Sequence, residues 1–255
     1  MAQAYGSTFA QFYNRQATAF AEEAAPVIYE FHLTQQQATS AHGKNLLDLC
    51  CGIGQLARFF LQRGFTVTGI DLSEPMLALA RQNAGDYVTQ GSATFLQADA
   101  SSFTVADSFN LVVSTYDALN HLPDLGALRG CFASVAAVTA NDGCFIFDLN
   151  TRQGIRRWNG IMINESEDGL VINRGIYDGG ERAQMLITGF IPRGEPGLFE
   201  RFEECVYNTV YTLSDVETLL VETGWRKVHF ARLSNLGEAV ATPEDESRVF
   251  IVAAR

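Results

Sequence analysis

The chain has 255 residues, a formal net charge of −11 at pH 7 and 47% hydrophobic residues. Its acidic balance disfavours nucleic acid as a partner, because binding to a phosphate backbone generally needs a basic face. No apolar run is long enough to span a membrane, and the first residues lack the basic-then-apolar pattern of a signal peptide. The five cysteines contain no C-x-x-C pair, so neither a metal site nor a disulfide framework is indicated. We therefore expect a cytoplasmic protein whose partner is a small molecule.

Residues 8–38 precede the first predicted strand and carry aromatic and aliphatic side chains at helical spacing. The pattern begins with Phe9 and Phe12 and continues to Ile28 and Phe31. It predicts one or two helices, which we expect to cap a binding site.

A glycine-rich turn follows the short apolar strand that begins at Asn45. The strand closes with Asp48, and Gly52 and Gly54 then lead into a predicted helix over residues 55–63. Because glycine has no Cβ, such a turn lets backbone N–H groups approach a bound molecule, and the helix N-terminus should face the same ligand. The turn alone also fits the G-x-G-x-x-G/A pattern of nicotinamide and flavin enzymes.

Acidic residues follow the next two predicted strands. Residues 65–70 form a buried strand ending at Asp71, whose carboxylate could accept hydrogen bonds from both hydroxyls of a ribose, each contributing about 1.5–3 kcal/mol. Ser73 is a good N-cap for the helix that follows. Residues 93–97 form the third strand, and Asp99 beyond it could accept a hydrogen bond from an exocyclic amine such as that of adenine.

Two more predicted strands, at residues 109–113 and 143–148, continue the α/β rhythm. Polar groups follow each of these strands as well. In open parallel sheets ligands bind at the carboxyl edge, so we expect the small-molecule site there.

The pattern changes after the fifth strand. Residues 155–210 predict a small antiparallel meander, and we expect this insertion to act as a β-rich lid on a single domain over residues 1–255. Ser214 is expected to cap a later helix. The remaining predicted elements are strands at 169–177, 182–191 and 199–212, the helix at 215–222, and an antiparallel pair of strands at 226–233 and 248–253.

Four stretches resemble motifs of class I S-adenosylmethionine-dependent methyltransferases, and they occur in the expected order within about residues 10–150. The acid after the third strand and the Asp-Leu-Ser-x-x-Met string favour this family over a nicotinamide enzyme. The resemblance implies a doubly wound, mostly parallel, Rossmann-like sheet of seven strands with an antiparallel terminal strand. The four stretches are Asp48–Gly54, Gly69–Met76, Gln97–Asp99 and Phe109–Leu122.

The resemblance also implies a binding site for S-adenosylmethionine. In this family an acid at the position of Asp48 orients the loop and reaches the cofactor's amino group. Cys50 departs from the pattern, because its position is often glycine. The residues assigned to the cofactor are Asp48, Cys50, Gly52, Gly54, Asp71, Leu72, Met76, Asp99, Ala100 and Thr115.

Two residues are candidates for catalysis. The loop from Thr115 to Leu122 resembles that of nucleotide-linked aminosugar N-methyltransferases, which place a catalytic histidine there, and His121 matches it. A base suits methyl transfer because an ammonium or hydroxyl acceptor must lose a proton. Residues 9–14 resemble an N-terminal element in which a tyrosine approaches the cofactor or the acceptor. Tyr13 matches that tyrosine, and Asn14 replaces the acid of the element.

The leading interpretation is methyl transfer from S-adenosylmethionine to a small-molecule acceptor, with nitrogen as one candidate target atom. No metal is needed, because a neutral thioether leaves in a direct displacement. Two alternatives remain. The glycines and Asp71 would also suit a nicotinamide-dependent oxidoreductase, and Cys50 leaves open a protein that binds the cofactor without catalysis.

Overall fold

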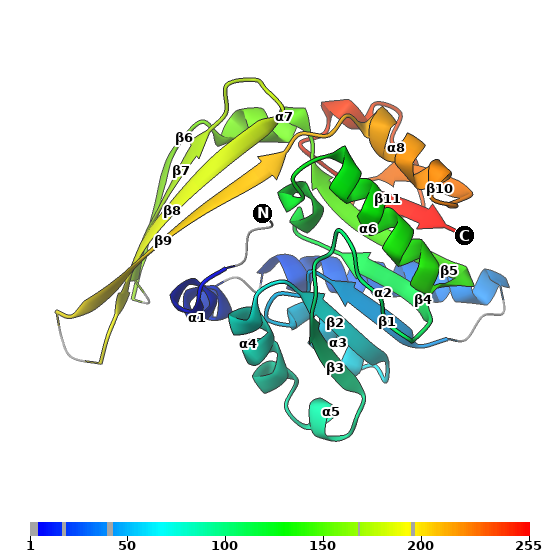
Figure 1. Ribbon diagram of the computed structural model, residues 1–255, viewed down its shortest axis with the longest axis horizontal. Coiled ribbons are helices and arrows are strands. Elements are labelled where there is room, and N and C mark those ends of the chain that lie inside the picture. The colour runs from blue at the N-terminus through cyan, green and yellow to red at the C-terminus, as the bar shows by residue number, and fades with distance from the viewer. Residues whose placement is uncertain (1–4, 17–18, 40–42, 168, 195–196) are drawn as a thin grey trace.

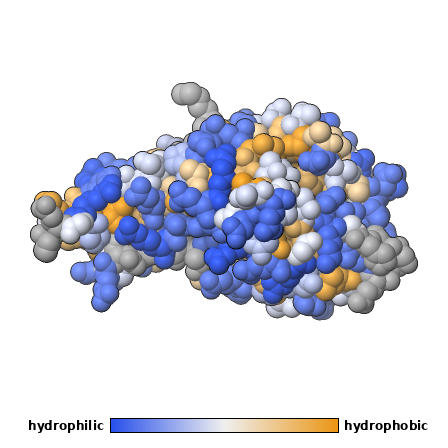
Figure 2. Space-filling view, turned by 90° about the horizontal axis from the view of Figure 1, so that it is seen from below, coloured by the Kyte–Doolittle hydropathy of each residue, from blue (hydrophilic) through white to orange (hydrophobic). Residues whose placement is uncertain are grey.

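Figure 1 shows two sheets, one flanked by helices and one standing apart from it. The computed structural model describes residues 5–16, 19–39, 43–167, 169–194 and 197–255. Within these residues no helix is both long and apolar enough to cross a membrane. Seen from below, the surface is largely hydrophilic, and hydrophobic residues gather in small patches (Figure 2).

The larger sheet has seven strands in the order β10-β11-β5-β4-β1-β2-β3. β11 runs antiparallel to both of its neighbours, whereas β1 to β5 pair in parallel. This confirms the predicted doubly wound sheet with its antiparallel terminal strand. The strands are β1 (Asn45–Leu49), β2 (Thr66–Asp71), β3 (Ala93–Gln97), β4 (Phe109–Ser114), β5 (Thr139–Asn150), β10 (Lys227–Ala231) and β11 (Arg248–Ala254).

Helices cover both faces of this sheet because side chains alternate between the faces along each strand. In β1, Leu47 and Leu49 pack on one face with Phe132 of α6, while Leu46 packs on the other with Phe60 of α3. The helices are α1 (Ser7–Gln16), α2 (Ala19–Thr39), α3 (Gln55–Leu61), α4 (Glu74–Ala84), α5 (Asp86–Thr89), α6 (Leu125–Val138), α7 (Arg152–Ile155) and α8 (Leu213–Glu222), with 3-10 turns η1 (Ala118–His121), η2 (Arg156–Trp158) and η3 (Pro243–Asp245).

The smaller sheet is antiparallel, with its strands in chain order β6-β7-β8-β9. Three of these strands match the predicted meander, and β6 is an addition. Every residue of β6 is exposed, so its sequence lacks the alternation of buried and exposed residues that would predict a strand. The strand is defined by its pairing with β7. The strands are β6 (Gly160–Ser166), β7 (Gly169–Ile176), β8 (Arg182–Pro192) and β9 (Phe199–Thr209).

Helix α1 lies between the two sheets. Phe9 of α1 packs in one cluster with Met76 of α4 and with Val171 and Phe202 of the smaller sheet. The rings of Phe9 and Phe202 lie 5.8 Å apart between centroids. The N-terminal helix thus closes one side of the space between the sheets.

The two helix caps predicted from sequence have different outcomes. Ser73 caps α4 as predicted, since its hydroxyl accepts a hydrogen bond from the Met76 N–H at 3.3 Å. The prediction for Ser214 is wrong, because α8 begins one residue earlier, at Leu213. Thr212 is the cap, and its hydroxyl accepts from the Asp215 N–H.

Candidate functional site

A cavity of about 550 Å³ lies between the carboxyl ends of the parallel strands and the smaller sheet. Its volume falls in the usual range for small-molecule sites. One wall comes from the segments that follow β1 to β4, and the opposite wall comes from β6 to β9, with α1 between them. A second cavity of about 60 Å³ adjoins it and shares Tyr13, Cys50, Gly52, Thr115 and Tyr116 with its lining.

Asp71 lines the larger cavity at the end of β2. One carboxylate oxygen accepts a hydrogen bond from the Gly52 N–H at 2.9 Å, and the other accepts from the Ser73 N–H at 2.8 Å. Burial raises the pKa of Asp71, and these backbone hydrogen bonds oppose the rise. Each carboxylate oxygen has more than one acceptor site, so Asp71 can hold the turn and still accept from a ligand.

Asp99 lines the same cavity beyond the end of β3, together with Ala100. One of its carboxylate oxygens accepts from the Ser101 N–H at 2.8 Å. Asp71 and Asp99, which are far apart in sequence, therefore border one space. Pairing of β2 with β3 in parallel register explains this, because it brings both strand ends to the same edge.

Asp48 lines the smaller cavity and is 3% exposed. It accepts a hydrogen bond from the Ala57 N–H at 3.1 Å, which ties the end of β1 to the first turns of α3. Burial raises the pKa of Asp48 to about 7, and the hydrogen bond from Ala57 opposes the rise. A carboxyl with this pKa changes charge near neutrality.

Three residues of the turn after β1 differ in backbone conformation and surroundings. Cys50 lines both cavities and has a φ of 60°, a conformation that favours glycine. Gly52 also has a positive φ, and a Cβ there would meet no atom within 4 Å, so its backbone borders open space. Gly54 lines neither cavity, and a Cβ there would lie 3.1 Å from that of Ala80. The absence of a side chain at Gly54 therefore allows α3 and α4 to pack closely, and its contact with the cofactor stays a prediction.

Eight of the predicted cofactor residues line the larger cavity, whereas Asp48 lines the smaller one and Gly54 lines neither. The eight are Cys50, Gly52, Asp71, Leu72, Met76, Asp99, Ala100 and Thr115.

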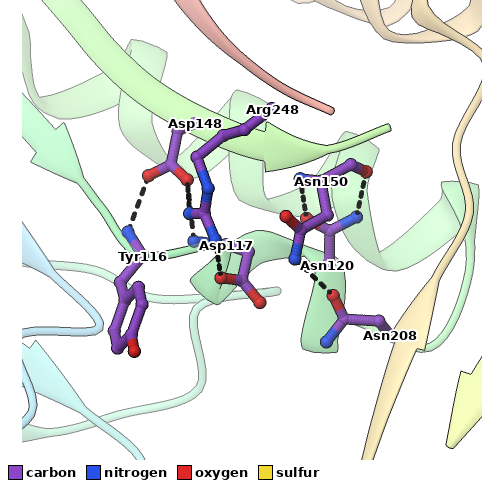
Figure 3. A network of polar contacts seen from close by, with 7 residues as sticks. All are labelled: Tyr116, Asp117, Asn120, Asp148, Asn150, Asn208 and Arg248. Atoms are coloured by element: carbon purple, nitrogen blue, oxygen red, sulfur yellow. Dashed lines mark hydrogen bonds and ion pairs between the residues drawn. The ribbon is translucent and has the colours of Figure 1, made fainter. Parts of the chain in front are cut away.

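The loop after β4 is held by a buried ionic network that the sequence did not reveal (Figure 3). Tyr116 and Asp117 both have positive φ, and their N–H groups donate to the two carboxylate oxygens of Asp148 at 2.6 and 2.9 Å. Arg248 of β11 bridges Asp148 and Asp117. Burial raises the pKa of Asp148 to about 6, and the charge of Arg248 opposes the rise. The network fixes a strained loop at the edge of the cavity.

His121 lies on η1 and lines the larger cavity, as predicted for the loop after β4. Its Nδ1 is 2.9 Å from the carbonyl oxygen of Tyr207 in β9. Because a carbonyl can only accept, this contact requires the proton on Nδ1. The neutral ring then keeps a lone pair on Nε2, as a general base requires.

Tyr13 lines both cavities from α1. Burial raises the pKa of its hydroxyl well above the usual value, and nearby Tyr116 adds to the rise. The hydroxyl therefore keeps its proton near neutral pH and can donate a hydrogen bond. The structure brings Tyr13 and His121 to one cavity from segments more than a hundred residues apart.

The chain is similar in sequence to known methyltransferases. Residues 46–143 match the family described as "Methyltransferase domain". A protein of Geobacillus, provisionally named a methyltransferase, is 27% identical over 213 residues, which are 82% of this chain and 84% of that protein. These matches weigh against the nicotinamide-dependent oxidoreductase.

Solved structures share the fold. A S-adenosylmethionine-dependent methyltransferase from Clostridium acetobutylicum superposes with a TM-score of 0.80 at 22% identity, covering 97% of both chains. The sugar N-methyltransferase KedS8 from Streptoalloteichus gives 0.76 at 18% identity, covering 100% of this chain and 95% of that one. Residues 46–143 therefore match a methyltransferase domain, and the chain as a whole has the fold of S-adenosylmethionine-dependent methyltransferases.

Proposed function

We propose that this enzyme methylates a nitrogen atom of a small-molecule acceptor held between the strand ends and the smaller sheet. The observation that carries the proposal is one cavity lined on one wall by Asp71 and Asp99 and on the other by β6 to β9, with His121 in its lining. Methyl transfer needs donor and acceptor in one enclosed space, and orientation alone can contribute about 7–11 kcal/mol.

S-adenosylmethionine fits the wall formed by the strand ends. Gly52 leaves open space beside its backbone, and Asp71 offers acceptor sites suited to ribose hydroxyls. In the same assignment Asp99 accepts from the adenine amine, and Asp48 reaches the amino group of the methionine portion from the adjoining cavity. When bound, the cofactor supplies a methyl group on a positively charged sulfur.

His121 serves as the general base in this proposal. The carbonyl of Tyr207 holds the ring with its proton on Nδ1, so Nε2 can take a proton from the acceptor nitrogen. Tyr13 keeps its hydroxyl proton and donates to the cofactor carboxylate or to the acceptor. No residue has to form a covalent bond to either molecule.

Nitrogen as the target atom is supported by the whole-chain likeness to KedS8, which is named a sugar N-methyltransferase. That likeness extends over β6 to β9, which we propose act as a lid within a single domain, with α1 and α2 as the cap. The acidic net charge supports a partner other than nucleic acid. Cytoplasmic localisation stays a prediction.

Matched acceptors test the target atom. Pairs of amines and alcohols with the same carbon skeleton are incubated with S-adenosylmethionine, and release of S-adenosylhomocysteine is measured. We expect turnover of amines and little turnover of the matched alcohols. The opposite preference would replace nitrogen by oxygen, and tight cofactor binding without turnover of any acceptor would favour a non-catalytic binding protein.

A further inference from the structure

The wall formed by the smaller sheet has a distinct chemical composition. Side chains alternate along these strands, and one face of the sheet lines the cavity. Five of its lining residues are apolar: Met162, Val171, Met185, Ile187 and Val206. The other three are asparagines: Asn164, Asn173 and Asn208. This wall therefore offers a ligand apolar contact area and uncharged hydrogen-bonding groups.

Positive charge is scarce around the cavity. Among its described lining residues, Arg248 is the only arginine or lysine, and its guanidinium already bridges Asp148 and Asp117. Asp71 and Asp99 add negative charge. Phosphates are normally bound by arginine, lysine or clustered backbone N–H groups, and an uncompensated buried charge is costly. The cavity is therefore unsuited to a diphosphate or phosphate ester.

Asn208 presents a hydrogen-bond donor with no partner in the described protein. The residue is 0% exposed and lines the cavity from β9, and its Nδ2 makes no hydrogen bond within the described chain. Its Oδ1 accepts from Asn150 Nδ2 at 3.3 Å, which directs the amide nitrogen away from Asn150 (Figure 3). Buried donors are normally paired, so we expect this N–H group to donate a hydrogen bond to a bound ligand.

The surroundings hold Asn208 firmly in place. Asn120 accepts from the Asn150 N–H and donates to the carbonyls of Asn150 and Thr209. Asn208 also follows Tyr207, whose carbonyl orients His121. One stretch of β9 therefore holds both the proposed base and an unpaired donor, as needed to fix an acceptor relative to the base.

We propose that the acceptor is a phosphate-free molecule, uncharged apart from its reacting amine, with an oxygen that accepts a hydrogen bond from Asn208 Nδ2. Its apolar side contacts the Met and Val side chains of the smaller sheet. The inference rests on the proposed methyl transfer and specifies its substrate class. It departs from the nucleotide-linked acceptors that the sequence resemblance implies.

The test compares matched acceptors with and without phosphate. One pair is the methyl glycoside of a 3-aminohexose and the same sugar linked to thymidine diphosphate, and another is an aminophenol bearing a second hydroxyl and its phosphate ester. Release of S-adenosylhomocysteine gives kcat and KM for each probe. We expect turnover of the phosphate-free member of at least one pair, with kcat/KM at least ten-fold above that of its partner.

The variant Asn208→Asp replaces the amide donor by an oxygen and keeps an acceptor for Asn150. We expect it to lower kcat/KM for the phosphate-free probe about ten-fold or more, mainly through KM. Affinity for S-adenosylhomocysteine should stay unchanged, which also reports correct folding. Asn141→Asp is the matched control, because Asn141 is exposed and lies outside the cavity lining. If Asn208→Asp fails to fold, Asn208→Ala takes its place.

Three results would overturn the proposal: a phosphate-bearing probe that equals or exceeds its partner, an unchanged KM in the Asn208 variant, or inertness of every phosphate-free probe while a phosphate-bearing probe is turned over. Failure of the methyl transfer itself would look different, because wild-type enzyme would then turn over neither member of any pair.

Discussion

His121 is oriented by a backbone carbonyl. Tyr207 lies 86 residues away in sequence, and its carbonyl oxygen fixes the proton on Nδ1. A ring held in one tautomer keeps its second nitrogen ready to accept a proton, and general base catalysis of this kind typically contributes about 10²–10⁴-fold in rate. In the proposed mechanism the residue therefore acts in turnover and not in cofactor binding.

His121→Ala should accordingly lower kcat by about 10²–10⁴-fold while leaving the dissociation constant for S-adenosylhomocysteine nearly unchanged. Steady-state kinetics and calorimetry check the two parts. His229→Ala is the matched control, since that histidine lies outside both cavities and contacts the Leu236 carbonyl. Equal turnover of His121→Ala and wild type would remove His121 from the mechanism.

Asp71 holds the turn after β1 and is the proposed ribose contact, so its replacement should act first on cofactor affinity. Asp71→Ala removes a charged acceptor, and a hydrogen bond to a charged group contributes about 1.5–3 kcal/mol, equivalent to a loss in affinity of at least about ten-fold. Calorimetry with S-adenosylhomocysteine measures this loss. Asp107→Ala, at an exposed loop position, is the control. Unchanged affinity in Asp71→Ala would refute the ribose assignment.

Asp48 should make stability depend on pH. Its pKa is about 7 in the folded protein against an ordinary 3.8, so the folded chain binds more protons than the unfolded chain between these values. The contribution of Asp48 to stability therefore falls as pH rises through this window. Asp48→Asn has no carboxyl to ionise. The free energy of unfolding of this variant minus that of wild type should therefore be larger at pH 8 than at pH 5.

Urea unfolding at the two pH values measures this difference. Effects of Asp148, whose raised pKa lies in the same window, are common to both proteins and cancel. The exposed Asp107→Asn should show no such change between the two pH values. A stability difference for Asp48→Asn that is equal at pH 5 and pH 8 would contradict the expectation.

At the scale of elements, β5, β11 and the loop after β4 are joined by Asp148, Arg248 and Asp117. Asp148 is 0% exposed, so its charge depends on the guanidinium and on two N–H groups for compensation. Removing one member of a buried ion pair leaves the other charge uncompensated. The antiparallel strand thus stabilises a loop that lines the cavity.

Arg248→Met should lower the free energy of unfolding by about 3–5 kcal/mol at pH 8, where Asp148 is ionised. Adding Asp148→Asn to this variant should recover part of the loss, because no buried charge then remains on that carboxyl position. Denaturant unfolding of the single and double variants measures the coupling. Arg129→Met breaks only an exposed pair with Glu222 and should cost less than about 1 kcal/mol. A loss of similar size in both single variants would argue against the buried network.

At the scale of the whole molecule, the site is an interface between two sheets. The strand ends supply the wall assigned to the cofactor, the smaller sheet supplies the wall assigned to the acceptor, and α1 packs against both. Met76 belongs to the cluster around α1 and also lines the cavity. A ligand in the cavity should therefore stabilise the assembled structure as a unit.

Thermal unfolding measures this stabilisation. S-adenosylhomocysteine at a hundred times its dissociation constant should add about 2.7 kcal/mol, which corresponds to a rise in Tm of about 5–10 °C for a chain of this size. NAD and NADP at the same concentration should leave Tm unchanged. Stabilisation by a nicotinamide cofactor alone would reopen the oxidoreductase alternative.

The sequence by itself determined the parallel sheet and the positions of its acids. Short apolar runs marked β1 to β5, and Asp71 and Asp99 followed two of them, so topology alone brought both side chains to one edge. The cap at Ser73 was equally local, because side chain and N–H lie three residues apart. Patterns of this kind depend on neighbours in the chain and can be recognised without coordinates.

Only the tertiary structure decided which polar groups find partners within the chain and which remain unpaired. Arg248 lies 100 residues from its partner Asp148, the carbonyl that holds His121 lies 86 residues away, and β6 is defined by its pairing with β7. Gly54 has a positive φ, packs against Ala80 and lines neither cavity. Asn208 is distinguished by a buried Nδ2 that has no hydrogen-bond partner among the described residues. Such properties arise from contacts between distant segments, and no local residue pattern records them.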